Sequence, residues 1–339
     1  MILLTGGTGF IGSYLLYYLV KDGQQVRALR RPGSSMKTNE FIVSNLACIE
    51  NEPSVLAALK AVEWVEGDIL DIDSLEEAME GIDTVYHLAA MVSFSAKDGK
   101  KIFHANVDGT ANVVNACIEK GIKKLGYLSS IAALARISGK TVDEESKSPK
   151  LYFASKYSES KYMAEAEVWR GAAEGLEVVI VNPGIVEGWG DFNRGSAEIF
   201  KTIYNGLQFY PSGSNGFVDA RDVGKILIQL MKTPAAIGNR YALVSENLSY
   251  KTLVNLMAES FKIKPPKYKT GKTLSYIGWL ADSFFSFLTR KDPLITKEIA
   301  NTATRDYSYS NAKIKKLLNY EFIPIKKTIE DVCRVYEGK

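Results

Sequence analysis

Cysteine and histidine are scarce in this chain of 339 residues, which has three cysteines and two histidines. Cys48, Cys117 and Cys333 are widely separated and form no motif spacing, so we expect no disulfide framework and a reducing compartment. His87 and His104 do not have a metal-ligand spacing, which argues against a histidine-based metal site. We therefore predict a cytoplasmic protein without a metal centre.

A large excess of one charge is also missing. The 42 basic and 39 acidic residues give a net charge of +3, whereas nucleic-acid-binding surfaces usually show a clustered basic excess. The apolar fraction of 46% is enough for a core in one large domain or two unequal lobes. These numbers favour a small-molecule substrate and no nucleic-acid partner.

Long hydrophobic runs are absent. The N-terminal MILLTGG lacks the basic segment and cleavage site of a signal peptide, and we interpret it as a strand. The stretch LSYIGWLADSFFSFLTR at 274–290 is interrupted by Asp282 and by serines, so it falls short of a membrane span. We interpret it as a core or pocket-lining helix; a membrane-surface helix and a lid over an apolar substrate are the alternatives.

Short apolar runs alternate with helical patterns in the first half of the chain. The expected strands are MILLTG, QVRALR, VEWVEGD, DTVYHLAA, KKLGYLSS and LEVVIVNPG, and the expected helices span residues 10–21, 73–79, 106–119 and 157–173. This alternation predicts right-handed crossovers and a parallel sheet covered on both faces, which is the α/β doubly wound (Rossmann) class.

The pattern becomes Gly-rich and irregular after Gly184, and FVDARDVGKILIQLM at 217–231 indicates a return to the sheet domain. We predict a nucleotide-binding domain from 1–184 and 216–244, and a smaller mixed substrate-binding lobe from 185–215 and 245–339. Because no Pro-rich linker separates them, the two lobes are expected to share a cleft.

The string LLTGGTGFIG lies between the first strand and an amphipathic helix. A tight strand-to-helix turn needs glycine, and a pyrophosphate can approach the backbone only where side chains are absent, beside the free N–H groups of the helix. In this context the motif predicts a dinucleotide site. The expected contacts are Gly6, Gly9, Phe10, Ile11 and Gly12.

The second strand ends in VRALRRPG, where an NAD site normally carries an acidic residue for the ribose. Arg30 and Arg31 stand there instead, and a guanidinium suits a phosphate, so we predict NADP rather than NAD, with Arg30 at the 2′-phosphate. Solvated arginines at a strand end are the alternative. Asp68 and Ile69, after the third strand, are expected to contact the adenine.

The motifs TGGTGFIG, GDI, YHLAA, NVDGTANVVNAC, YLSSIAAL, YSESKYMAE, VNPGIVEG and FVDARDV occur in this order. From residue 1 to about 230, the chain thus resembles the extended short-chain dehydrogenase/reductase family of the NAD-dependent epimerase/dehydratase type. VRALRR and SSIAAL resemble most the dihydroflavonol reductase and 3β-hydroxysteroid dehydrogenase branch. The resemblance implies a Ser-Tyr-Lys site and a homodimer.

YFASKYSESK at 152–161 contains Y-x-x-S-K twice. Five residues rotate a helix by roughly 500°, so the two tyrosines lie on different faces. The Tyr157 face continues with small or apolar residues suited to packing on a sheet, whereas the Tyr152 face carries charges. We assign Tyr157 and Lys161 to catalysis and place Tyr152 in the approach loop or in helix-start packing.

The resemblance also implies roles for residues at other strand ends. Ser130 is the expected catalytic serine, with Ser129 closer to the cofactor, and Asn106 resembles an asparagine near the cofactor, with helix bonding as its alternative. Asp219 and Asp222 are expected to fix loops. The remaining cofactor contacts are expected at Ala89, Ala90, Met91, Pro183 and Gly184.

Three functions compete. An NADP-dependent reductase or alcohol dehydrogenase is favoured by VRALRR and SSIAAL. A nucleoside-diphosphate-sugar epimerase with tightly bound NAD is the alternative, although many epimerases have an acidic residue at the end of the second strand. A non-catalytic NADP sensor would not need the Ser-Tyr-Lys set.

Overall fold

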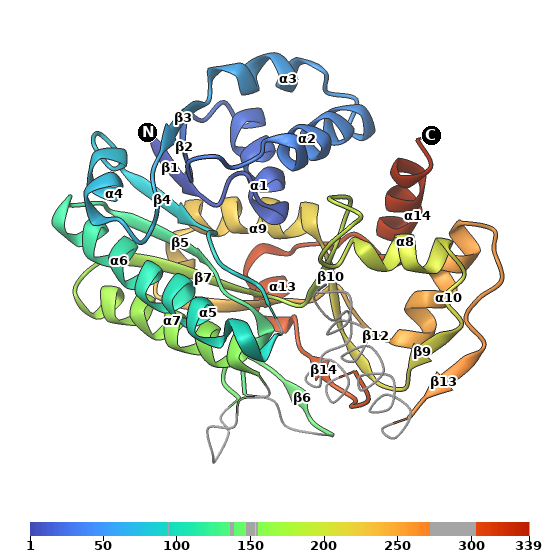
Figure 1. Ribbon diagram of the computed structural model, residues 1–339. Coiled ribbons are helices and arrows are strands. Elements are labelled where there is room, and N and C mark those ends of the chain that lie inside the picture. The colour runs from blue at the N-terminus through green and yellow to red at the C-terminus, as the bar shows by residue number, and fades with distance from the viewer. Residues whose placement is uncertain (94, 136–138, 147–152, 154, 272–302, 339) are drawn as a thin grey trace.

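Seven parallel strands form the central sheet of the structure, a computed structural model that describes residues 1–93, 95–135, 139–146, 153, 155–271 and 303–338 (Figure 1). The strand order is β11-β7-β5-β4-β1-β2-β3. In this order β1 and β4 are neighbours, the point at which doubly wound sheets bind ligands beyond the carboxyl ends of their strands. The strands are β1 (Ile2–Thr5), β2 (Val26–Arg30), β3 (Glu63–Glu66), β4 (Thr84–His87), β5 (Lys124–Leu128), β7 (Glu177–Pro183) and β11 (Asn239–Leu243).

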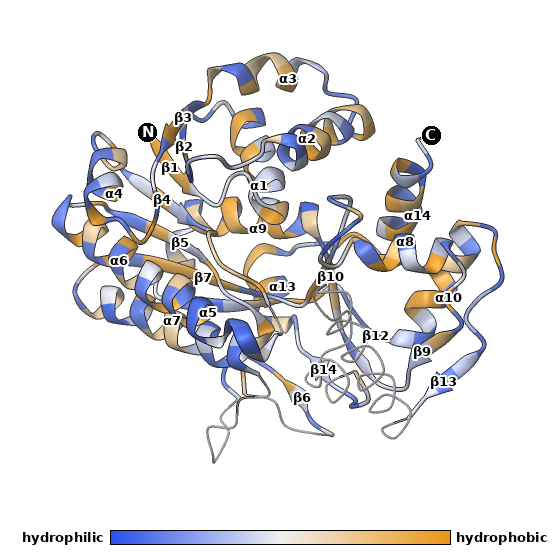
Figure 2. Cartoon of the chain, viewed as in Figure 1, coloured by the Kyte–Doolittle hydropathy of each residue, from blue (hydrophilic) through white to orange (hydrophobic). Residues whose placement is uncertain are grey.

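Helices cover both faces of this sheet, which confirms the predicted doubly wound α/β class. One face carries α1 (Phe10–Lys21), α2 (Lys37–Ile49), α3 (Ser54–Ala58) and α9 (Ala220–Lys232). The other carries α4 (Ile72–Ala78), α5 (Gly99–Phe103), α6 (Gly109–Glu119) and α7 (Lys156–Ala173). Alternate residues of a strand enter opposite cores, as Leu3 and Leu4 do. A strand covered on both sides is therefore apolar throughout, and Figure 2 shows the central strands as mostly hydrophobic.

Most of the expected elements occur near their predicted positions. The helix at 10–21 has the predicted bounds, whereas the helix expected at 106–119 is α-helical only from Gly109, after a π-helical turn at His104–Asp108. Helix α2 was not predicted from the sequence, although the spacing of its buried Ile42, Val43 and Leu46 is helical and could have revealed it.

Smaller sheets and further helices form the rest of the described chain. β10 (Ser214–Asp219) pairs with β8 (Ile185–Glu187) and β12 (Glu246–Ser249), so the strand expected to return to the central sheet belongs to a smaller one, and α9 and β11 make the return. β9 (Phe209–Pro211) pairs with β13 (Tyr268–Thr270), and β6 (Thr141–Val142) with β14 (Ser308–Tyr309). The other helices are α8 (Glu198–Tyr204), α10 (Tyr250–Ser260), α13 (Ala312–Leu318), α14 (Ile325–Tyr336) and the short turns η1 (Leu59–Ala61), η2 (Ala96–Asp98), η4 (Ile131–Ala133) and η5 (Pro234–Ala236).

Two predictions concern segments that lie outside the described residues: the role of Tyr152 and the helix expected at 274–290. Within the described ranges, no helix is both long and apolar enough to cross a bilayer.

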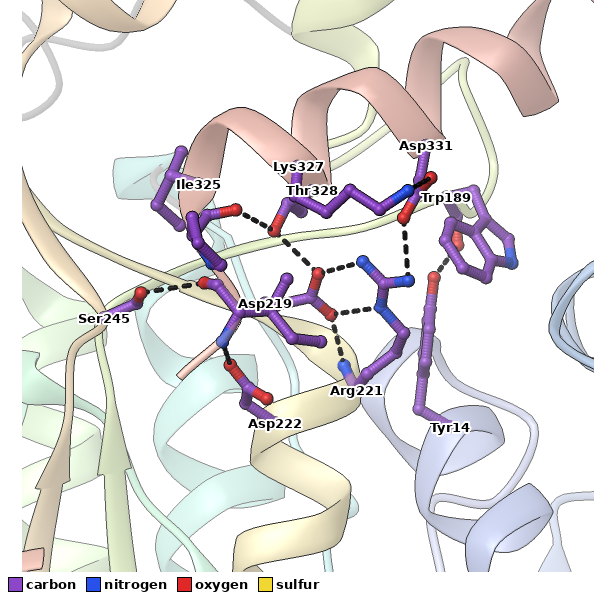
Figure 3. A network of polar contacts seen from close by, with 12 residues as sticks. Tyr14, Trp189, Asp219, Arg221, Asp222, Ser245, Ile325, Lys327, Thr328 and Asp331 are labelled. Carbon is purple, nitrogen blue, oxygen red and sulfur yellow. Dashed lines mark hydrogen bonds and ion pairs between the residues drawn. The ribbon is translucent and has the colours of Figure 1, made fainter. Parts of the chain in front are cut away.

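A buried ionic network fastens α14 to the start of α9 (Figure 3). Asp219 caps α9 and accepts hydrogen bonds from Arg221 Nε at 2.9 Å and Nη2 at 2.6 Å, while Arg221 Nη1 donates to Asp331 at 2.9 Å. Thr328 Oγ1 donates to Asp219 at 2.7 Å. Asp222 accepts from the Tyr320 hydroxyl at 2.8 Å. Both Asp219 and Asp222 thus fix the chain, in agreement with the prediction.

Candidate active site

The Gly-rich turn brings the backbone of β1 close to the loop after β4. Gly6 has a φ of +78°, and a Cβ there would lie 2.7 Å from the backbone nitrogen of Ala89; a Cβ on Gly12 would collide with the carbonyl oxygen of Gly6. Gly9 is the N-cap of α1, and Phe10 and Ile11 open the helix. This side-chain-free cradle at a helix N-terminus fits the pyrophosphate of a dinucleotide.

Asn39 supports the same turn from α2, a role that was not predicted from the sequence. Its buried amide donates to the carbonyl of Gly7 and to the Ser13 hydroxyl, both at 3.1 Å. Ser13 in turn donates to the carbonyl of Gly9 at 2.7 Å. The turn is therefore held by side chains behind it and by the Gly9 N–H, which donates to the carbonyl of Gly6 at 3.0 Å.

Arg30 ends β2 beside Glu66, the last residue of β3. The two side chains form an ion pair with 3.2 Å between Nη2 and Oε1, and the guanidinium is partly exposed. Asp68 accepts from the backbone nitrogen of Leu70 at 3.1 Å, and Ile69 is buried against Gly109. These residues lie at or just after the carboxyl ends of the paired strands β2 and β3.

The loop after β4 is held by Asn106, which is 1% exposed. The Asn106 side chain accepts from the backbone nitrogen of Met91 at 2.7 Å and donates to its carbonyl at 3.0 Å. It also donates to the Ser160 hydroxyl on α7 at 3.0 Å. Ala89 donates to the Thr5 hydroxyl at 3.3 Å, and Ala90 is exposed. Asn106 thus joins the loop at 89–91 to the helix that carries Tyr157 and Lys161.

Helix α7 begins with a capping box: the Ser155 hydroxyl accepts from the backbone nitrogen of Ser158, and Ser158 reciprocates. This start gives the two lysines of the doubled motif different surroundings. Lys156 is 63% exposed and pairs with Glu159 at 2.7 Å. Lys161 is 2% exposed and donates to the carbonyl of Leu128 at 2.8 Å.

Burial lowers the pKa of Lys161 to about 7, and the carboxylate of Glu165 opposes that shift. The Lys161 Nζ also donates to the Tyr127 hydroxyl at 3.1 Å. Tyr157 lies one turn before Lys161 on the same helix and is partly exposed. The helix therefore carries an accessible phenol and a buried amine that titrates near neutrality.

The two serines after β5 have different partners. The buried Ser129 donates to the Glu165 carboxylate at 2.6 Å. Ser130 is the N-cap of η4, and its hydroxyl oxygen accepts from the backbone nitrogen of Ala132 at 3.1 Å. Asn182 donates to both the carbonyl of Ser130, at 3.0 Å, and Glu165, at 2.8 Å. Ser129 is thus engaged with α7, and the backbone of Ser130 is fixed at the strand end.

Glu165 also receives Arg240 from β11, with 3.0 Å between Nη1 and Oε1. Pro183 follows Asn182 at the end of β7, and Gly184 donates to the carbonyl of Leu243 at 3.0 Å. Because β1, β4, β5 and β7 are parallel, the Gly-rich turn, the loop at 89–91, the serines and Pro183 all follow the carboxyl ends of their strands at one edge of the sheet. That edge carries a cradle for a dinucleotide and side chains suited to proton transfer.

Comparisons with known proteins agree with this arrangement. The family described as NAD dependent epimerase/dehydratase matches residues 2–243. A Synechocystis protein provisionally named dihydroflavonol 4-reductase is 30% identical over 99% of this chain and 94% of its own. Cinnamoyl-CoA reductase 1 of Petunia hybrida is 28% identical over 100% of this chain and 92% of its own.

Among solved structures, gox2253 matches with a TM-score of 0.81 and 28% identity, covering 100% of this chain and 98% of that one. The chain therefore belongs to the NAD dependent epimerase/dehydratase family of extended short-chain dehydrogenases/reductases, whose members bind a nicotinamide cofactor and act on small molecules.

Proposed function

We propose that the chain is an NADP-dependent reductase or dehydrogenase that interconverts a ketone and a secondary alcohol. The proposal rests on the burial of the Lys161 amine one helical turn from the accessible phenol of Tyr157. Reduction of a carbonyl needs a hydride and a proton; the bound nicotinamide supplies the hydride from C4. Tyr157 supplies the proton to the substrate oxygen, and in oxidation it takes that proton back.

Lys161 and Ser130 assist Tyr157 in this proposal. An unperturbed tyrosine, with a pKa of about 10, is a poor base at neutral pH, and an ammonium nearby favours its phenolate. Ser130, held at the end of β5, donates a hydrogen bond to the substrate oxygen. The choice of Tyr157 over Tyr152 is supported by the lysines, because Lys156 is exposed and paired with Glu159, whereas Lys161 is buried.

The proposed cofactor is NADP, and the preference for NADP over NAD rests on Arg30. Its guanidinium ends β2, where a ribose would lie, and it is partly exposed, so it could exchange Glu66 for a 2′-phosphate. The pyrophosphate is assigned to the Gly-rich turn and the first residues of α1, and the adenine to Asp68 and Ile69. The other proposed contacts are Ala89, Ala90, Met91, Asn106, Ser129, Pro183 and Gly184.

The names of the two curated relatives favour reduction over epimerisation and suggest aromatic carbonyl substrates. The test is a panel of dihydroflavonols and simple aryl ketones, incubated with purified protein and NADPH while absorbance at the nicotinamide band is followed. We expect NADPH oxidation with at least one of them, and none from a Tyr157→Phe variant. Protein that retains bound NAD, oxidises no NADPH across the panel and inverts a UDP-sugar would be an epimerase instead.

A further inference from the structure

A chain of buried polar side chains runs from Lys161 beneath the site to strand β1. The Lys161 Nζ donates to the Tyr127 hydroxyl at 3.1 Å, and that hydroxyl bonds the Thr110 side chain. Thr110 Oγ1 lies 3.1 Å from His87 Nε2, and His87 Nδ1 lies 2.7 Å from Thr5 Oγ1. All of these residues are at most 2% exposed, so their polar groups must satisfy one another.

The number of protons on each group determines which group donates in these hydrogen bonds. The Thr110 hydroxyl has a single proton, which it donates to the carbonyl of Asn106 at 2.6 Å. It therefore accepts from His87 Nε2, and His87 Nδ1 accepts from Thr5. Burial lowers the pKa of His87 to about 3, which agrees with the neutral ring that this assignment requires.

Tyr127 lies at the Lys161 end of this chain. Its phenol oxygen accepts the hydrogen bond from the ammonium of Lys161. The Lys161 Nζ also lies 4.7 Å from the centre of the Tyr127 ring. Leu128 and Tyr127 thus take two of the three N–H groups of Lys161, which leaves one for the proposed cofactor and substrate.

We propose that Tyr127 is a positioning residue for Lys161, whose phenol oxygen holds the buried ammonium in place and keeps it charged. A buried amine without acceptors would lose its proton. Among the described residues, the titratable groups around Lys161 include Glu165 on its own helix, with Tyr157 one turn before it, Tyr127 on β5 and His87 on β4. The neutral Tyr127 is in direct hydrogen-bond contact with Lys161. The effect on turnover rests on the proposed function, but the effect on the ammonium does not.

The ammonium can be measured without a substrate. In protein labelled with 13C at the lysine ε-carbon, the Lys161 resonance is identified as the one lost in a Lys161→Met variant, and its chemical shift is followed against pH. Tyr127→Phe removes one hydroxyl from the contact. We expect the Lys161 midpoint to fall by about one pH unit or more, since a hydrogen bond to a charged group is worth one to two pKa units.

Tyr17→Phe is the matched control, because Tyr17 is a buried tyrosine of α1 whose hydroxyl has no partner among the described residues. It should leave the Lys161 midpoint unchanged. Should Tyr127→Phe not fold, Tyr127→Met, which also removes the hydroxyl that Lys161 contacts, is expected to lower the midpoint as well. A midpoint that stays at the wild-type value in the folded variant overturns the proposal.

Turnover then separates this inference from the proposed function. Activity retained by Tyr157→Phe, together with a shifted Lys161 midpoint in Tyr127→Phe, would refute the catalytic assignment and keep the positioning role. An inactive Tyr157→Phe variant, together with an unchanged Lys161 midpoint in Tyr127→Phe, would support the catalytic assignment and refute the positioning role.

Discussion

Replacing Arg221 with methionine should destabilise the protein strongly. The change removes the guanidinium that bonds Asp219 and Asp331, which are 1% and 0% exposed. Among the described residues, Asp219 would keep its bonds from the Arg221 backbone and Thr328. Asp331 would keep Lys327 at 2.6 Å and the more distant Arg334 at 3.9 Å. Removing one partner of a buried ionic group costs about 3 to 5 kcal/mol.

Urea unfolding followed by circular dichroism measures this loss as a lower midpoint with an unchanged slope. The matched control is Arg194→Met, because Arg194 is 73% exposed and forms an ion pair with Asp191 at 3.0 Å. An exposed pair contributes about 1 kcal/mol or less. If Arg221→Met lowers the free energy of unfolding no more than Arg194→Met does, the reasoning about the buried network is wrong.

Two further predictions concern the cofactor and the pH dependence of stability. NADPH should bind more tightly than NADH, and Arg30→Ala should weaken NADPH binding about tenfold or more while leaving NADH binding nearly unchanged. Dissociation constants measured by nicotinamide fluorescence check both expectations. Tighter binding of NADH than of NADPH by the wild type would contradict the choice of cofactor. Burial beside Asp219 raises the pKa of Glu187 from 4.5 to about 8, so between these values the folded state binds more protons and stability falls as pH rises. Glu187→Gln should flatten that part of the curve in urea unfolding at pH 5, 6.5 and 8; a variant with the wild-type slope would show that Glu187 is ionised in the fold.

The parts of the fold that were predicted well are those with a local pattern in the sequence. The Gly-rich turn, α1 and the strands of the central sheet each have a signal within a few neighbouring residues. The buried face of α7 is the one that carries Ser160, Lys161, Ala164 and Val168, as its sequence predicted. An amphipathic pattern indicates which side of a helix faces inward, and this was enough to separate Lys161 from Lys156.

The supporting contacts of the site could not be predicted in the same way. Tyr127 lies 34 residues from Lys161, Asn39 lies 32 from Gly7, and Arg240 lies 75 from Glu165. Such pairs depend on how the strands are ordered and on the exact depth of each helix, which no local pattern contains.

The difference between Ser129 and Ser130 has a signal that could have been used. Successive residues of a strand point to opposite faces, so two adjacent serines cannot both turn to one site. The structure directs the Ser129 hydroxyl to Glu165 of α7, and the Ser130 hydroxyl to the turn that follows.

The central claim is that the phenol of Tyr157 transfers a proton in a hydride-transfer reaction. The most direct test is the rate of NADPH oxidation by Tyr157→Phe on a carbonyl substrate that the wild type reduces, with NADPH affinity measured in parallel. Tyr162→Phe, on the same helix, is the control and should remain active. The account predicts that Tyr157→Phe binds NADPH as the wild type does but does not turn over; turnover retained in Tyr157→Phe and lost in Tyr152→Phe would contradict it.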